Sequence, residues 1–457
     1  MHYDLVQNYA MKCRLYPTKT QAQAIDDALH GIQVFHNCLV YDIWHNQLHT
    51  RTHPKKNQDG SVSTEVVHFP DISAALKADY KNKLIVDHPI IAKCPQAALT
   101  TNVGLKADLT KKFGKIPIEY QKPRYYNDDH PRRSYTYQES TSKIRSTENP
   151  NVFRINLAII GNVKVRGWNQ KLRFGNESTD FLKWAQTAPK TSITVTIKKD
   201  AAGDYFIVFK LKECLKPFPK STKVQTGVDV GIKDIAICAD GYKAENKKFK
   251  QQEKRHQRLL NRRLSRRWGA SNENYRKVHN KIKSERRDFY NHPSDNQKPP
   301  AFIKPSNRYL KTRIKHARLN RKIARKRDLW NHEVSRKIVK SYGFIGIESL
   351  NISGMVRNKY LSFALNDAAF GTLLTNIQYK SSWHGRTVSE IGRWTPSSKR
   401  CSSCGYLYNS NDQYHLKPWT LTIREWDCPV CNTHHDRDIN AAKNILYYAK
   451  EAANFQN

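Results

Sequence analysis

The chain has 457 residues, of which 38% are hydrophobic, and carries 79 Lys and Arg against 40 Asp and Glu, a formal net charge of +39. This apolar fraction supports folded cores and excludes a disordered tail, and the length allows two to four domains. So large a positive surplus predicts a polyanionic partner, with nucleic acid first and a membrane surface second.

No run of about 18 apolar residues occurs, and the first residues, MHYDLVQNYAMKCRLYP, lack an apolar segment behind basic residues. We therefore expect an intracellular protein without a membrane span, in the cytoplasm or nucleoid, or in the nucleus of a eukaryotic host. Five of the nine cysteines stand singly, as reduced core residues usually do: Cys13, Cys38, Cys94, Cys214 and Cys238.

The N-terminal region begins with a predicted strand at residues 11–16. Thr18 and Gln21 fit a capping box that opens a helix, because each side chain can bond the other residue's backbone N–H. Apolar residues then recur at helical spacing, which indicates packing: Ala24, Ile25, Ala28, Leu29, Ile32, Leu39, Ile43 and Trp44. Residues 45–115 are irregular and polar, with weaker helical patterns at 72–80 and 95–113, and we interpret them as a helical insertion.

Short runs that alternate apolar and polar residues follow, separated by turn signals. They read NVFRINLAII, GNVKVR, KLRFG, SITVTIKK and DYFIVFKLK. This pattern predicts an all-β barrel or sandwich, which the N-terminal strand could close.

The next segment, TGVDVGIKDIAICADG, predicts a β-hairpin with Asp229 inside its first, β-branched strand. Glu348 likewise stands near the end of a short strand, in YGFIGIESL. A carboxylate in a buried strand is costly unless it is paired or binds a metal. Carboxylates brought together from separate strands suit Mg²⁺, and two such ions can stabilise the attacking and leaving oxygens of a phosphodiester.

Positive charge is concentrated between residues 243 and 340, which contain 32 Lys and Arg but only 8 Asp and Glu. Apolar residues at helical intervals predict packed helices with a basic outer face: Tyr275, Val278, Ile282, Ile314, Ile323, Trp330, Val334 and Ile338. Residues 291–307 predict an interrupting loop. Solvated faces usually mix both signs of charge, so we expect phosphate contacts here, although RRLSRR and RKIARKR also resemble nuclear localisation signals.

Cys401 and Cys404 form one CxxC pair and Cys428 and Cys431 another, with 23 residues between the pairs. This spacing predicts a tetrahedral structural zinc site, with a pair of disulfides as the alternative. His434 and His435 could compete as ligands, but we expect them at the surface or against nucleic acid. Asp438 then stands at the start of an Ala-rich helix, where it could be only an N-cap.

With these residues in place, the sequence resembles the TnpB family of transposon-encoded RNA-guided nucleases, which are related to type V CRISPR effectors. The matching segments are GVDVGIKDIAICADG, GIESLNISGM and HDRDINAAKNIL, with YKSSWHGRTVSEIGRWTPSSKRCSSCG leading into the zinc ribbon and a weaker match at RLYPTKTQAQAI. The resemblance implies that Asp229, Glu348 and Asp438 coordinate catalytic magnesium, with Asp436 as an alternative to Asp438.

The resemblance also implies an α+β multidomain fold, in which an RNase H-like RuvC nuclease domain contains an inserted zinc ribbon. A wedge β-barrel with a helical recognition insertion precedes it. The expected boundaries are 1–17 for the first wedge strand, 18–115 for the recognition insertion, 116–223 for the barrel, 224–395 for RuvC segments I and II, 396–433 for the ribbon, and 434–457 for RuvC segment III and the C-terminal helix.

The expected function is that of an RNA-guided DNA endonuclease, which binds a structured guide RNA and cleaves target DNA beside a short motif by two-metal hydrolysis. Trp394 could stack on DNA bases or belong to the core. Alternatives are a guide-dependent DNA-binding protein that does not cleave, a guide-free structure-specific nuclease and a transposase. The first nucleic-acid contacts to test are basic residues of the helical section: Arg262, Arg263, Arg266, Arg267, Arg325 and Lys326.

Overall fold

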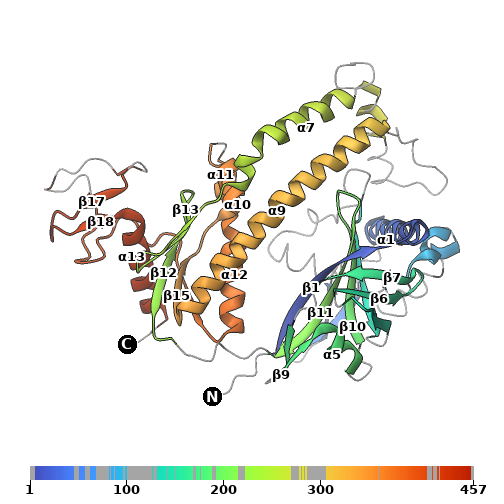
Figure 1. The fold of residues 1–457 in the computed structure, drawn as a ribbon, viewed down its shortest axis with the longest axis horizontal. Helices are drawn as coiled ribbons and strands as arrows, with labels where there is room; N and C mark the ends of the chain where they lie inside the picture. Colours follow the sequence, from blue (N-terminus) through green and yellow to red (C-terminus); the bar gives the residue numbers. More distant parts are fainter. Residues whose placement is uncertain are drawn as a thin grey trace.

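The computed structural model shows two β-sheet lobes with a long helical hairpin between them (Figure 1). It describes residues 6–45, 51–56, 62–67, 82, 84–86, 88–95, 98–99, 126, 131–140, 143–149, 151–167, 171–174, 177–187, 192–214, 222–268, 277–278, 280–282, 284–285, 305–358, 360–408, 414, 419–420 and 423–453. Among these, no helix is long and apolar enough to cross a membrane.

The first lobe is built on a seven-stranded sheet in which every neighbouring pair is antiparallel. Its order is β4-β10-β11-β1-β7-β6-β5. The strands are β1 (Val6–Tyr16), β4 (Ser134–Ser140), β5 (Ile144–Ser146), β6 (Val152–Leu157), β7 (Gly161–Arg166), β10 (Ser192–Lys199) and β11 (Tyr205–Cys214). The N-terminal strand β1 lies between β11 and β7, so it joins the later strands as predicted. Within the described residues β4 and β5 are the two edges, so hydrogen bonds do not close this sheet into the barrel we expected.

Helix α1 (Lys19–His45) packs on this lobe and begins at the predicted capping box. The Thr18 N–H donates to Gln21 Oε1 over 3.0 Å, and the Gln21 N–H donates to Thr18 Oγ1 over 3.3 Å. The predicted apolar stripe is buried at Ile25, Ala28, Leu29 and Ile32. The 3-10 helix η1 (Pro89–Lys93) packs against it.

The region we expected to be a helical insertion also contains β structure. Strands β2 (Arg51–Lys56) and β3 (Val62–Val67) pair as an antiparallel hairpin, which corrects the purely helical expectation. The predicted helix at 72–80 and nearly all of that at 95–113 lie outside the described residues. Between β7 and β10 come a second hairpin, β8 (Lys171–Phe174) with β9 (Glu177–Asp180), and the short helix α5 (Phe181–Thr187).

The second lobe is built on a five-stranded mixed sheet of order β14-β13-β12-β15-β16. Strands β12 (Gln225–Asp229), β13 (Asp234–Cys238) and β14 (Lys243–Glu245) form an antiparallel meander, which includes the predicted hairpin. Strands β15 (Phe344–Glu348) and β16 (Thr387–Ile391) run parallel to β12. Helices α9 (Asn307–Ser341) and α12 (Phe370–Trp383) cover one face, and α13 (Arg437–Ala452) covers the other.

Two glycines let α13 pack unusually close to the sheet. Gly227 of β12 and Gly346 of β15 are direct cross-strand partners. A Cβ on Gly227 would lie 2.1 Å from the Ala442 carbonyl oxygen, and a Cβ on Gly346 would lie 2.7 Å from Ala449 Cβ. Any larger residue at Gly227 would therefore push the helix backbone away from the sheet.

The basic section forms a helical hairpin with little core of its own. Helix α7 (Lys254–Arg267) buries only Leu260, which packs with Leu319 and Ile323 of α9, while α6 (Phe249–Gln252) precedes it. The predicted buried positions Ile323, Val334 and Ile338 are buried, but Val278 is 52% exposed and that prediction is wrong. Most of the predicted loop at 291–307 lies outside the described residues.

One ion-pair network links α9 to the first lobe. Arg321 contacts Asp200 over 2.6 Å and also pairs with Asp204, and Arg14 of β1 pairs with the same Asp204. The two aspartates flank the turn between β10 and β11. Because all four side chains are at most about one-third exposed, the network fixes the long helix against the seven-stranded sheet.

The single cysteines behave as predicted where their side chains are described. Cys13, Cys94 and Cys238 are buried thiols without a disulfide, and Cys38 is a partly buried one. Burial raises the pKa of Cys13, Cys94 and Cys238 to about 12, so these thiols stay protonated and unreactive.

Candidate active site and metal centre

Asp229 and Glu348 lie side by side at one edge of the five-stranded sheet. Each is the last residue of its strand, and β12 and β15 are parallel with Val228 opposite Ile347. Side chains alternate between the faces of a strand, so Asp229 shares a face with Gly227 and Glu348 shares a face with Gly346. That face is the one covered by α13.

Asp438 reaches the same edge from the first turn of α13. The N-cap of this helix is Asp436, whose Oδ1 accepts the backbone N–H groups of Asp438 and Ile439, each over 3.0 Å. Asp436 also forms a 2.6 Å ion pair with Lys243. The capping role considered for Asp438 therefore belongs to Asp436. The Asp438 side chain, which is 20% exposed, does not cap the helix and can contribute its carboxylate to the site.

The electrostatics show that the Asp229 carboxyl group is affected by both of the other carboxyl groups. Burial, followed by the negative charges of Asp438 and Glu348, raises the pKa of Asp229 to about 7. Burial also raises the pKa of Glu348. Like charges gathered in a partly buried site are destabilising unless a cation joins them, which is a pattern typical of functional sites. This excess of negative charge fits divalent-cation binding.

Two arginines compensate part of that charge. Arg437 donates from Nε and Nη2 to Asp438 Oδ1 over 3.1 and 3.0 Å, and Arg424 Nη1 lies 3.6 Å from Asp438 Oδ2. Within the described residues, the three carboxylates do not form a group with ligand atoms all within 4.8 Å, whereas the four cysteines do.

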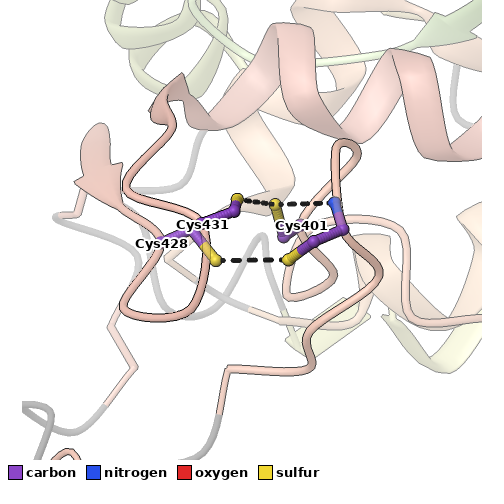
Figure 2. Close-up of side chains that lie close together, drawn as sticks. Cys401, Cys428 and Cys431 are labelled. Atoms are coloured by element: carbon purple, nitrogen blue, oxygen red, sulfur yellow. Dashed lines mark hydrogen bonds between the residues drawn. The ribbon is translucent and has the colours of Figure 1, made fainter.

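The four cysteines lie in two facing loops with their sulfurs turned toward one another (Figure 2). Cys401 Sγ lies 3.7 Å from Cys431 Sγ, and Cys404 Sγ lies 3.5 Å from Cys428 Sγ. Zinc–sulfur bonds of about 2.3 Å in a tetrahedron place neighbouring sulfurs about 3.8 Å apart, so the cluster could hold zinc. The sulfurs are too far apart for disulfides, whose S–S bond is about 2.05 Å.

Neighbouring side chains support this cysteine cluster. Hydrogen bonds from Thr433 lower the pKa of Cys431 to about 6, which favours the thiolate that binds metal. His435 Nε2 lies 3.0 Å from Cys401 Sγ, and the His435 ring packs 4.9 Å from that of Trp426. His435 is buried, so our expectation of a surface histidine is wrong for it, whereas His434 is exposed and contacts Asp427 over 2.8 Å.

Two buried asparagines join the cysteine loops to α13. Asn444 Nδ2 donates to the carbonyl oxygens of Ser397 and Arg400 over 2.8 and 2.6 Å, and Asn440 Nδ2 also donates to Arg400 O over 2.7 Å. Asn440 Oδ1 accepts the Ser402 N–H over 2.9 Å. The loop that leads into the first cysteine pair is therefore fixed to the helix that carries Asp438.

Sequence reasoning missed Arg424, Arg437, Asn440 and Asn444. Asn440 and Asn444 are four residues apart on a helical face that otherwise carries Ala441, Ala442 and Ile445. Polar residues inside an apolar stripe are the signal that could have found the asparagines, because buried amides need hydrogen-bond partners. No comparable signal marks Arg424.

The predicted nucleic-acid contacts fall into two groups. Arg262, Arg263 and Arg266 are exposed on α7. The other three also make contacts within the protein: Arg267 donates to Arg308 O over 3.1 Å, Arg325 lies 6.0 Å from the Phe206 ring centroid, and Lys326 lies 5.9 Å from that of Phe249. Trp394 is 86% exposed and is therefore not a core residue.

Known proteins resemble this chain along most of its length. A family model described as "Cas12f1-like, TNB domain" matches residues 370–445, which include all four cysteines and Asp438. A Streptomyces pristinaespiralis protein named as a candidate RNA-guided DNA endonuclease is 27% identical over 439 residues, covering 96% of this chain and 88% of that protein. A TnpB-like protein of Acanthamoeba polyphaga mimivirus is 27% identical over 136 residues, covering 28% of this chain and 24% of that protein.

A cryo-EM structure of a Cas12f1–sgRNA–target DNA complex covers 96% of this chain and 99% of its own, with 13% identity and a TM-score of 0.30.

Proposed function

This chain belongs to the TnpB family, and from that premise we propose that it is an RNA-guided DNA endonuclease. It would bind a structured guide RNA and cut target DNA beside a short motif. The observation that carries the proposal is the convergence of Asp229, Glu348 and Asp438, where burial, followed by the charges of Asp438 and Glu348, raises the pKa of Asp229 to about 7.

The sheet topology supports an RNase H-like nuclease domain. An antiparallel meander of β14, β13 and β12, followed by parallel strands β15 and β16 with helices on both faces, is the arrangement expected of that fold. In this proposal the seven-stranded sheet is the core of the wedge domain, and the cysteine loops between β16 and α13 are the inserted zinc ribbon.

In the proposed mechanism Asp229, Glu348 and Asp438 would hold Mg²⁺. When bound, the metal supplies Lewis-acid activation of water and stabilises charge on the leaving oxygen. The chain itself fixes where its ligands stand: β12 and β15 place two carboxylates on adjacent parallel strands, and the cap at Asp436 fixes the first turn that carries the third. Arg437 and Arg424 orient the Asp438 carboxylate and offset part of its charge.

Exposed arginines on α7 would bind guide RNA or heteroduplex phosphates. Counterion release drives such contacts, and base pairing would supply the sequence specificity. The small core under α7, formed by Leu260, Leu319 and Ile323, leaves most of that arginine-rich helix exposed.

The test is to purify the protein without nuclease treatment, sequence the RNA that stays bound in moderate salt, and assay cleavage of a matching DNA duplex in Mg²⁺. We expect one discrete RNA and cleavage that Asp229→Ala abolishes without releasing the RNA. Asp328→Asn, an exposed acid on α9, is the matched control and should cleave normally.

Each failure of that test has a distinct meaning. A random mixture of cellular RNAs that washes off with salt would refute the guide. Discrete RNA with target binding but no cleavage would instead indicate a DNA-binding protein that does not cut.

A further inference from the structure

Trp394 stands in an exposed turn beside the carboxylates. Strand β16 ends at Ile391, which is the cross-strand neighbour of Glu348, and the Ser349 N–H donates to Ile391 O over 3.1 Å. Three residues later comes Trp394, in a turn closed by a 3.1 Å hydrogen bond from the Thr395 N–H to Gly392 O. Neighbouring strands are about 4.8 Å apart and successive Cα atoms 3.8 Å apart, so the Cα atoms of Trp394 and Glu348 lie within about 16 Å.

The turn cannot drift away from this edge, because both of its ends are anchored. Ile391 is buried in the sheet, and Ser397, on the other side of the turn, accepts a 2.8 Å hydrogen bond from Asn444 of α13. Helix α13 carries Asp438 two turns earlier. Trp394 is therefore held between the strand beside Glu348 and the helix of Asp438.

The indole is exposed in a manner suited to stacking. It is 86% exposed, and the Arg393 guanidinium lies 4.9 Å from its ring centroid. A planar cation against one side of an aromatic ring limits the rotation of that ring and adds positive charge next to it. Single exposed apolar residues are common, but this one combines a stacked cation with a fixed place at the site edge.

We infer that Trp394, with Arg393, is a stacking platform that positions one unpaired base of the DNA strand entering the carboxylate site. The inference rests on the proposed nuclease function and adds a substrate-positioning residue to it. Every base has an apolar face, so stacking holds a strand without reading its sequence, and the neighbouring guanidinium would contact the phosphate or the ring. Trp394 would position the substrate and take no part in the chemical step.

The first experiment compares the guide-loaded full-length protein with Trp394→Ala, Trp394→Phe and the control Leu329→Ala, another strongly exposed apolar side chain at 71%. Steady-state cleavage of single-stranded target DNA in Mg²⁺ is measured. We expect Trp394→Ala to raise KM roughly 5- to 150-fold, the range that a base–aromatic stack is worth, with little change in kcat. Trp394→Phe should recover most of the loss, and Leu329→Ala should match wild type.

The second experiment changes the DNA in place of the protein. A series of DNA strands is prepared, each with an abasic site at a different position. At one position the abasic site should raise the KM of wild type, because the stacked base is missing. At that same position it should leave the already raised KM of Trp394→Ala unchanged. A 2-aminopurine at that position should be quenched on binding to Asp229→Ala, and the quenching should be lost when Trp394→Ala is added.

The outcomes separate this inference from the proposed function. If wild type cleaves and Trp394→Ala has the same KM, or loses kcat alone without rescue by Phe, the platform is refuted while the nuclease stands. If wild type never cleaves, the proposed function fails, and the 2-aminopurine signal alone tests the stacking platform. Quenching that is lost in Trp394→Ala supports the platform. Quenching that persists in Trp394→Ala overturns it.

Discussion

Asp229→Asn should stabilise the metal-free protein while abolishing cleavage. The wild-type carboxyl has its pKa raised from 3.8 to about 7, first by burial and then by Asp438 and Glu348. A carboxyl whose pKa is higher in the folded state costs stability once it ionises, so the penalty is absent below about pH 4, grows through pH 4–7 and is complete above about pH 7.

The size of the effect follows from the shift. The pKa of Asp229 is raised by about three units, and each unit corresponds to about 1.36 kcal/mol, so ionised Asp229 lowers the free energy of unfolding by at most about 4 kcal/mol. Partial solvent access should reduce this penalty to about 2 kcal/mol. Asparagine has nearly the same shape and carries no charge, so it removes the penalty without creating a cavity.

The assay is urea unfolding of the full-length protein at pH 5.5 and pH 8, in magnesium-free buffer that leaves zinc in place. We expect the free energy of unfolding of Asp229→Asn to exceed that of wild type, with a larger difference at pH 8. Added Mg²⁺ should stabilise wild type more than the variant, because ligand binding to the folded state adds stability. A difference that is absent at pH 8, or equal at the two pH values, would contradict the electrostatic account of this site.

Four further predictions concern the surroundings of the site. Cys428→Ser should reduce bound zinc below one per chain by metal analysis and lower both thermal stability and cleavage, because a structural zinc site contributes folding free energy. Asn444→Ala should cost about 1–3 kcal/mol in urea unfolding, since it removes the amide that donates to the Ser397 carbonyl oxygen while Arg400 O keeps its bond from Asn440, whereas exposed Lys443→Ala should cost little. Gly227→Ala should cost about 3 kcal/mol or more and reduce cleavage, because its Cβ would meet the α13 backbone. Replacing three exposed arginines with alanine should lower the salt slope of RNA binding by about 2 to 3 in a filter-binding series: Arg262, Arg263 and Arg266.

Local signals in the sequence predicted local structure well. The Thr18 capping box, the β12–β13 hairpin and the cysteine cluster each depend on residues whose spacing determines their geometry. The hairpin β2–β3 was missed because its strands contain Pro54, His53 and charged residues, which mask the alternation of a strand.

The contacts between distant segments could not be predicted. Nothing near Asp229 shows that β12 will pair with β15, more than a hundred residues later, or that α13 will pack where Gly227 meets Gly346. The arginines beside Asp438 depend on the same long-range packing. Such features are set by tertiary structure, which overrides local propensity.

The asparagine contacts on α13 have a consequence for modularity. The chain leaves the second lobe near Ser397–Ser402 and returns at Arg437, whose N–H donates to Arg424 O over 2.8 Å. The departing segment is bonded to the first two turns of α13, and the returning segment begins that helix. The segment between them is thus an excursion with adjacent ends. Because doubling the length of a loop costs only about 0.6 kcal/mol, we expect the stretch between the two cysteine pairs, in the part that precedes Ile423 and Arg424, which contact Arg437 and Asp438, to accept added or deleted residues, or an engineered sensor domain, without moving Asp438.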